Sequence, residues 1–191
     1  MDYKNDINNY LNNEIEIIKT LDVNVINQIM NAITESQERG STIYICGNGG
    51  SAATASHYCC DFNKGVSGES CKNTNFICLS DNIPTMTAIA NDVSYDEVFS
   101  YQLRNRIKPG DLVFVISGSG NSKNIVRAME LAKEKGNTII GLCGYSGGKV
   151  KEMSDICLHV DINNMQIVED VHMILDHCMM YILAYGSCKG C

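Results

Sequence analysis

The sequence lacks long apolar runs and an excess of positive charge. No segment approaches the roughly 20 apolar residues that a membrane-spanning helix needs, so we expect no such helix. The first residues, 1–6, are polar and no apolar signal segment follows, so we expect a cytoplasmic protein. The net charge of −7 argues against a protein that neutralises nucleic-acid phosphates. Binding of a small anion by local dipoles remains compatible with this composition.

A disulfide framework is also absent, although the chain contains ten cysteines. Cys188 and Cys191 form a lone CxxC, and a zinc site would need a second pair, so we expect free thiols there. Cysteines inside expected strands and helices are best interpreted as reduced, buried, small apolar side chains. These are Cys46, Cys78, Cys143, Cys157 and Cys178.

Apolar strand-like runs alternate with amphipathic helical patterns along the whole chain. Strands that are apolar on both faces and separated by helices predict a parallel sheet covered on both sides. The fold class is therefore α/β, a three-layer α/β/α sandwich of about five parallel strands preceded by N-terminal helices, and we expect one domain over residues 1–191. The expected strands are 42–46, 75–80, 111–117, 137–143 and 156–160, and the expected helical segments are 7–39, 51–63, 83–107, 122–135, 147–153 and 167–185.

Two loops share one design, a β-branched run followed by a Gly/Ser/Asn turn and a helix that opens near a serine. The loops are Gly47–Ser51 and Ser117–Ser122. In parallel sheets such loops lie at the carboxyl ends of the strands, and the helix N-termini that follow them favour an anion. The sequence therefore predicts a phosphate site, although a tight strand-to-helix turn alone would also explain each loop.

The type of anion can be narrowed. Gly47, Gly49 and Ala52 fit the dinucleotide pattern GxGxxA, but the acidic residue expected about 20 positions later is missing, because Asp81 comes too late. A Walker A loop is excluded because no Gly-Lys-Ser/Thr follows the glycines. With both nucleotide-binding patterns set aside, the two loops suit the phosphate group of a sugar monophosphate. We therefore expect no nucleotide cofactor. The hydroxyl donors of this phosphate cradle would be Ser51, Ser117, Ser119 and Ser122.

Four titratable residues suggest the chemistry. His57 and Asp61 lie four residues apart on an expected helix, so they share one face and are either a ligand pair or an acid and a base. Glu169 and His177 would be about 12 Å apart in one regular helix, too far to share a metal directly. Either Glu169 lies at the start of that helix, or the two residues act from opposite ends of a substrate.

Several of these motifs resemble the SIS (sugar isomerase) family. Within that family the chain looks most like the phosphoheptose isomerases, which interconvert sedoheptulose 7-phosphate and glycero-manno-heptose 7-phosphate. The resemblance covers nearly the whole chain in the same order. It is carried by Gly47–Ser51, Ala90–Asp92, Ile116–Ser122, Gly144–Lys149, Glu169–His172 and His177.

The resemblance implies a homotetramer with active sites at subunit boundaries, in which residues 1–40 contribute to oligomer packing. It places the phosphate on the four serines and the sugar hydroxyls at Asn48 and Asp92, and it includes Gly49 among the substrate- and phosphate-binding residues. It also implies a catalytic carboxylate and histidine, often with zinc. The catalytic candidates are Asp61, Glu169 and His177, and the zinc candidates are His57, Asp61, Glu169 and His177.

Two positions depart from the family pattern. Asp61 stands where these isomerases usually carry a glutamate, and Glu169 stands where they usually carry a glutamine. A carboxylate that is shorter by about 1.5 Å loses reach toward the proton, and near-attack geometry tolerates little displacement. Two interpretations follow, that Glu169 has taken over as base, or that the substrate is a different sugar phosphate.

Three hypotheses follow from the sequence. The first is an aldose-ketose isomerase, because moving a proton between adjacent carbons through an enediol needs a carboxylate base and a proton donor. The second is a non-catalytic SIS module that binds a sugar phosphate or a protein partner. The third, based on the GxGxxA pattern alone, is a nucleotide-dependent oxidoreductase.

Overall fold

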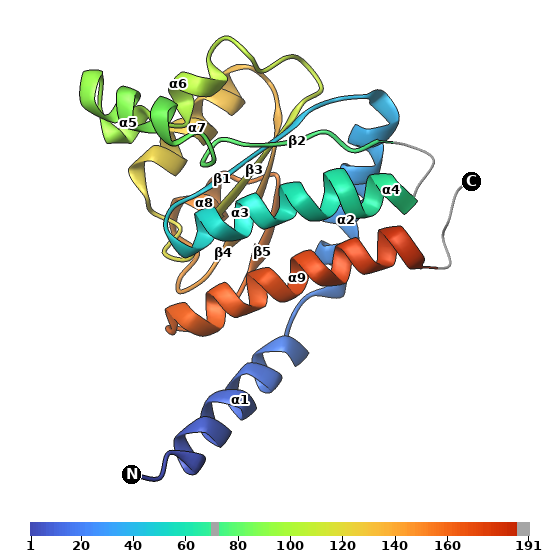
Figure 1. Cartoon of the computed structure of the whole chain (residues 1–191), viewed down its shortest axis with the longest axis vertical. Coiled ribbons are helices and arrows are strands. Elements are labelled where there is room, and N and C mark those ends of the chain that lie inside the picture. Colours follow the sequence, from blue (N-terminus) through green and yellow to red (C-terminus); the bar gives the residue numbers. More distant parts are fainter. Residues whose placement is uncertain (70–72, 187–191) are drawn as a thin grey trace.

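The computed structural model describes residues 1–69 and 73–186, and its centre is a five-stranded parallel sheet. The strand order is β2-β1-β3-β4-β5, so the chain starts near one edge and then winds toward the other (Figure 1). All five expected strands are present and parallel, which confirms the α/β prediction. The strands are β1 (Ile43–Gly47), β2 (Phe76–Cys78), β3 (Leu112–Ser117), β4 (Thr138–Cys143) and β5 (Ile156–His159).

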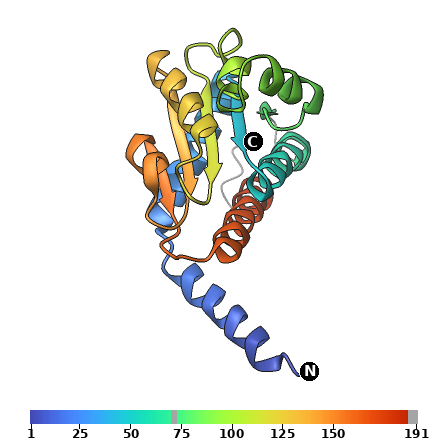
Figure 2. The ribbon, with the colours of Figure 1, turned by 90° about the vertical axis from the view of Figure 1, so that its left-hand side faces the viewer.

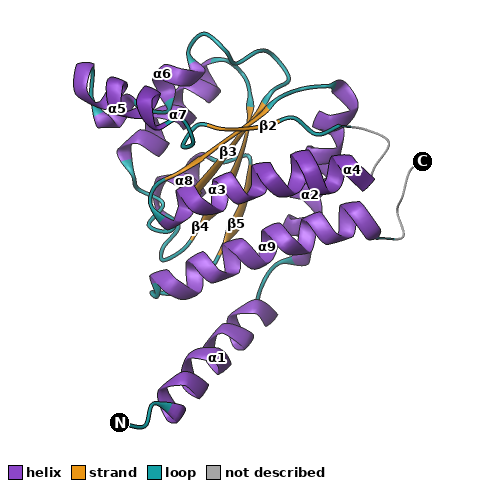
Figure 3. Ribbon diagram, viewed as in Figure 1, coloured by secondary structure: helices purple, strands orange, loops and turns teal. Residues whose placement is uncertain are grey.

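Helices cover both faces of the sheet (Figures 2 and 3). In β1, Ile43 and Ile45 pack toward one face, whereas Tyr44 and Cys46 pack toward the other, as strand geometry requires. The first face is covered by α2 (Val23–Arg39), α3 (Gly50–Cys60) and α9 (Met165–Tyr185). The second is covered by α5 (Ile83–Asp92), α6 (Ser100–Leu103), α7 (Lys123–Glu134) and α8 (Gly148–Met153). The three-layer prediction is therefore confirmed.

The expected helical segment 7–39 is two helices rather than one. α1 (Lys4–Lys19) ends at Thr20, and α2 begins after Asp22, whose side chain accepts a hydrogen bond from the backbone N–H of Asn24. Helix α1 has no buried residue and extends away from the body of the molecule (Figures 1 and 2). Within one chain, Ile7, Leu11 and Ile15 of this helix therefore stay about half exposed, at 49–55%.

The prediction of one continuous helix over residues 83–107 was wrong. It is divided into α5, a 3₁₀ turn (Tyr95–Glu97) and α6, because Ser94 is extended at φ −173° and ψ 159° and interrupts the helical path. Helix α3 likewise ends at Cys60 and continues as a π-helical turn (Asp61–Val66) into α4 (Ser67–Glu69).

A contact with the sheet accompanies that π-helical turn. The side chain of Asn63 donates to the carbonyl of Phe76 and accepts from its N–H, both at 2.8 Å. This pairing ties the turn to β2, and π-helical turns are often found at functional sites. Asp61 is the first residue of the turn.

No helix within residues 1–69 and 73–186 combines the length and apolarity needed to cross a membrane. The seven cysteines in these ranges are all free thiols. Cys46 and Cys143 are buried as expected and Cys78 and Cys157 are half-buried, but Cys178 is exposed, so the prediction that it is buried was wrong. The expected free thiols of Cys188 and Cys191 lie outside the described residues.

Candidate active site

The two serine loops lie side by side at the carboxyl ends of β1 and β3. These strands are neighbours in the sheet, and Gly47 is in register with Ile116. Gly49, at φ 55°, precedes α3, and Ser122 precedes α7 without using its hydroxyl as a cap. A cavity of about 170 Å³ opens between the loops. It is lined by Asn48, Ser51, Ile116, Ser117, Gly118, Ser119, Ser122, Met165 and Glu169.

All four predicted phosphate serines line this cavity, and Asn48 is held in place beside them. Its amide and that of Asn124 exchange two hydrogen bonds of 2.9 Å, and its oxygen also accepts from the hydroxyl of Tyr95 at 2.8 Å. Asn124 and Tyr95 were not singled out from the sequence, because their role depends on α7 and the 3₁₀ turn meeting the first loop. A small anion in this cavity would meet the serine hydroxyl groups and the N-termini of α3 and α7.

Two predicted substrate-binding residues are not among those that line the cavity. Gly49 forms the turn before α3 but does not line the cavity. Asp92 is exposed at the end of α5, where it accepts a hydrogen bond from the side chain of Asn91. The cavity within one chain therefore receives only part of the expected sugar-binding set.

Glu169 lies next to the start of α3. A Cβ placed on Gly50 would collide with its carboxylate, so the glycine leaves the room that this side chain occupies. Helical spacing places three positions on one face of α3 and its continuation, namely 50, 57 and 61. The same spacing places positions 169, 176 and 177 on one face of α9. We call the line where these two faces meet the α3–α9 seam.

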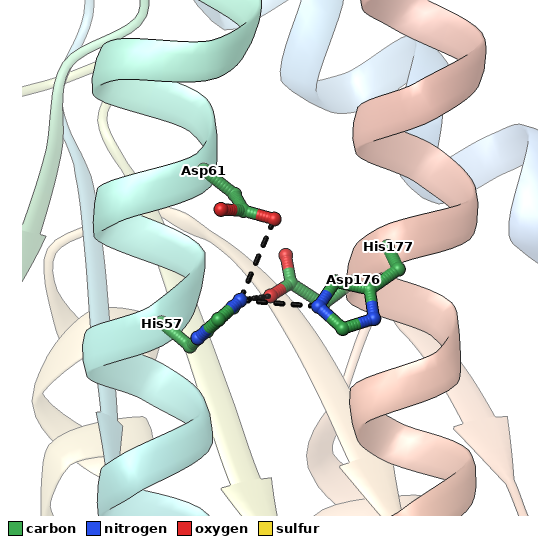
Figure 4. Close-up of side chains that lie close together, drawn as sticks. All are labelled: His57, Asp61, Asp176 and His177. Carbon is green, nitrogen blue, oxygen red and sulfur yellow. Dashed lines mark hydrogen bonds and ion pairs between the residues drawn. The ribbon is translucent and has the colours of Figure 1, made fainter.

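A second cluster lies further along the seam, formed by His57, Asp61, Asp176 and His177 (Figure 4). The Nε2 atoms of the two histidines are 3.1 Å apart. The Nε2 atom of His57 is 3.6 Å from Oδ2 of Asp61 and 3.9 Å from Oδ2 of Asp176. The four potential ligand atoms all lie within 4.8 Å of one another.

This cluster contains three of the four predicted zinc ligands. Glu169 is not part of this cluster in one chain and lines the cavity beside the serines instead, so its place in the zinc set stays a prediction. Because α9 is one unbroken helix from Met165 to Tyr185, Glu169 and His177 are about 12 Å apart along its axis. The structure thus favours the interpretation in which they act from opposite ends of a ligand.

Asp176 was not singled out from the sequence. Its side chain is completely buried, and neither carboxylate oxygen has a hydrogen-bond partner. Burial, and secondarily repulsion from Asp61, raises the pKa of Asp176 to about 8. The available signal was a carboxylate seven residues after Glu169 in an otherwise apolar stretch.

The geometry of the cluster suits a tetrahedral metal ion. Nitrogen and oxygen ligands of zinc lie at about 2.0–2.2 Å from the ion, which puts two ligand atoms of a tetrahedron about 3.3–3.6 Å apart. The measured separations of 3.1, 3.6 and 3.9 Å around Nε2 of His57 bracket that value. A cation would also supply the partner that the buried carboxylate lacks.

Comparison with known proteins shows the family. The family model described as SIS domain matches residues 2–144. The chain belongs to the SIS domain family. This SIS domain protein is 34% identical to the phosphoheptose isomerase of Rhodospirillum rubrum over 157 residues, which cover 82% of the chain and 83% of the relative. It is 37% identical to the phosphoheptose isomerase of Aliarcobacter butzleri, with 78% of each chain covered.

Solved structures agree with this assignment. A phosphoheptose isomerase from Francisella tularensis superposes on the SIS domain protein with a TM-score of 0.88 and 29% identity, covering 96% of this chain and 99% of the other. A phosphoheptose isomerase from Neisseria gonorrhoeae gives a TM-score of 0.86, also at 29% identity, with 95% and 98% covered.

Proposed function

We propose that this protein is a cytoplasmic aldose-ketose isomerase that interconverts sedoheptulose 7-phosphate and glycero-manno-heptose 7-phosphate through an enediol. The proposal is supported by family membership and by the names of the relatives. The observation that carries it is the seam between α3 and α9, which has a phosphate cradle at one end and a histidine and carboxylate cluster at the other. The free thiols agree with a reducing compartment.

The length of the seam matches a substrate of this size. Seven residues separate Gly50 from His57, a rise of about 10 Å along α3. An extended seven-carbon chain spans roughly 8 Å, and its phosphate ester adds roughly 3 Å, given carbon–carbon bonds of about 1.5 Å. With the phosphate in the cradle, C1 and C2 would therefore lie near the cluster.

The cradle end is proposed to bind and orient the substrate. Ser51, Ser117, Ser119 and Ser122 would donate hydroxyl hydrogen bonds to the phosphate, with the dipoles of α3 and α7 directed at it. Asn48 and Glu169 would contact sugar hydroxyls, since both line the cavity beside these serines. Glu169 is therefore assigned to positioning the sugar rather than to the reacting carbons.

The cluster end is proposed to carry the proton transfer. Asp61, whose side chain keeps 17% of its surface exposed, would take the proton from one carbon and return it to the other. His57 and His177 would face the two substrate oxygens, and Asp176 lies buried behind them. A zinc ion held by this cluster would polarise the substrate carbonyl.

The decisive experiment is an NMR assay of zinc-reconstituted protein with sedoheptulose 7-phosphate in deuterated water. We expect a new aldose signal and deuterium at C2. Asp61→Asn should lower the exchange rate by about 10²–10⁴-fold, because a general base is lost. Glu169→Gln should mainly raise KM, and an equal loss of exchange in this variant would move the base to Glu169.

Catalytic silence with every aldose and ketose phosphate would refute the proposal. Binding of sedoheptulose 7-phosphate without turnover, together with a stoichiometric protein partner, would favour a non-catalytic SIS module. A nucleotide absorbance in the purified protein would instead favour the oxidoreductase hypothesis.

We also propose that the chain, as one SIS domain over residues 1–191, forms a homo-oligomer, with a tetramer as the expected state, and that residues 1–40 take part in its packing. Helix α1 contacts α9 on one side, where the hydroxyl of Tyr10 donates to Asp170. Along another side Ile7, Leu11 and Ile15 repeat every four residues and are 49–55% exposed. A stripe of this kind on an extended helix is suited to a second copy of the chain.

A further inference from the structure

Tyr145 has a strained backbone in the loop that follows β4. Its φ is 49°, and no other non-glycine residue within 1–69 and 73–186 has a positive φ. A bulky side chain disfavours this left-handed conformation, so it persists only where neighbouring groups hold it, and such positions cluster at functional sites. The N–H of Tyr145 donates to the carbonyl of Ile162 at 3.2 Å, and its carbonyl lies 2.7 Å from Nε2 of His159. The strained residue is therefore held through both of its backbone groups.

His159 is the last residue of β5 and presents a fixed donor to this loop. Its Nδ1 atom is 3.1 Å from the ammonium of Lys151, which can only donate a hydrogen bond. The ring hydrogen therefore lies on Nε2, which donates to the carbonyl of Tyr145. His159 is not among the residues that line the serine cavity, so any effect on a ligand there must act through this loop.

The loop 144–150 packs directly against the second serine loop. The N–H of Gly144 donates to the carbonyl of Gly118 at 2.9 Å, and the N–H of Val150 donates to that of Gly120 at 3.0 Å. Gly120 approaches the loop so closely that an added Cβ would lie 2.0 Å from a backbone oxygen. A shift of one loop is therefore transmitted to the other.

Asn121 carries this contact to a cavity serine. Its Oδ1 accepts from the N–H of Lys149 at 3.1 Å, and its Nδ2 donates to the carbonyl of Ser119 at 3.0 Å. Its own N–H also donates to the hydroxyl of Ser119 at 3.3 Å. Ser119 lines the cavity, so one asparagine fixes a cavity hydroxyl relative to the loop after β4.

We propose that His159 is a positioning residue for the serine cavity. It holds Tyr145 in its left-handed conformation and thereby keeps the loop 144–150 against the second serine loop. The place of Ser119 in the cavity follows from that contact. The inference rests on the proposed function only in taking phosphate as the group that the serines bind. A space-filling role for His159 would need the shape of its ring but not the hydrogen on Nε2.

Two substitutions at His159 separate the donor from the ring. Glutamine places an amide nitrogen near the position of Nε2, whereas the shorter asparagine reaches only that of Nδ1. Calorimetry of the full-length protein with inorganic phosphate is the measurement. We expect His159→Asn to weaken phosphate binding by about tenfold, because a displaced Ser119 loses a hydrogen bond to a charged group. His159→Gln should stay within about threefold of the wild type, because the donor is kept.

A glycine at position 145 gives an independent test, because glycine adopts a positive φ without strain. In the Tyr145→Gly background, His159→Asn should change phosphate affinity by about threefold or less. Native-state hydrogen exchange measured by NMR supplies a readout that needs no ligand. The amides of Gly144, Lys149 and Val150 should exchange faster in His159→Asn and at the wild-type rate in His159→Gln.

Wild-type phosphate affinity in His159→Asn, or equal losses in both His159 variants, would overturn the inference. A loss that is the same when residue 145 is glycine would overturn it as well, since the strained residue would then not carry the effect. Failure of the proposed function is a separate result. It would show as phosphate binding and exchange rates that follow these expectations without isomerase turnover.

Discussion

The carboxylate of Glu169 occupies the space that a side chain at Gly50 would need. Gly50 is the first residue of α3 and lies within the first serine loop, and Glu169 lies in the second turn of α9, so their contact joins the cavity to the seam. Gly50 has no positive φ, and its requirement is therefore for space rather than for backbone freedom. That distinction can be tested by substitution.

Gly50→Ala should lower kcat/KM by about 10–100-fold while leaving the free energy of unfolding within about 1 kcal/mol of the wild type. The added Cβ displaces Glu169 from the cavity, and a hydrogen bond to a charged group is worth about 1.5–3 kcal/mol. Stability changes little because alanine favours the helix by up to about 1 kcal/mol and the displaced carboxylate is the end of a flexible chain.

Gly68→Ala is the matched control, since Gly68 has no neighbour within 4 Å of an added Cβ and no positive φ. Steady-state kinetics and urea unfolding of both variants provide the measurement. Equal kinetics for Gly50→Ala and the wild type would show that the position of Glu169 does not matter to the reaction.

Ser119→Ala should raise KM for the sugar phosphate by about tenfold or more with little loss of stability. Ser119 lines the cavity and is exposed, so the substitution removes a donor to phosphate without opening the core. Inorganic phosphate should compete with substrate more weakly in the same variant. Ser41→Ala, at the opposite end of β1, serves as control, and a similar KM change there would contradict the cradle assignment.

The stability of the protein should fall as pH decreases from about 6.5 to about 4, in part because of His172. Burial lowers the pKa of this fully buried histidine from 6.5 to about 4. In that window the unfolded chain binds a proton that the folded chain does not, so stability rises with pH and is lost as pH falls. The loss between pH 8 and pH 5 should be about 2 kcal/mol from this group.

Urea unfolding of wild type and His172→Leu at pH 8 and pH 5 measures this contribution. The variant should show a smaller difference between the two pH values. His159→Gln is measured in parallel as the loss of an imidazole from a partly buried position. An unchanged pH dependence in His172→Leu would contradict the assignment.

Leu11→Asp should reduce the molecular mass observed by analytical ultracentrifugation, if the exposed stripe of α1 is the proposed packing surface. A charge in the middle of an apolar interface is desolvated without a partner. Asn13→Asp places the same charge on an exposed position of another face of α1 and should leave the mass unchanged. A wild type that sediments as a monomer at micromolar concentration would refute the oligomer proposal.

Local pattern was sufficient for most of the fold. The five strands and the helices between them follow from β-branched runs and apolar periodicity, which are properties of neighbouring residues. The breaks inside the helical patterns were harder to predict from the sequence. The extended backbone at Ser94 and the pairing of Asn63 with β2 depend on contacts outside the helical segment itself. The meeting of the four serines at one cavity was predictable because parallel strands bring their carboxyl ends to one edge.

The sequence alone determined the α/β architecture, the cradle loops and three members of the cluster, since each follows from spacing within one element or from the resemblance those motifs carry. Only the tertiary structure decided which carboxylates share a site. Asp176 joins the histidines and Glu169 joins the serines because the rotation of α9 against α3 is set by packing across the seam. Helical periodicity places both carboxylates on one face, and the contact between the two helices separates their roles.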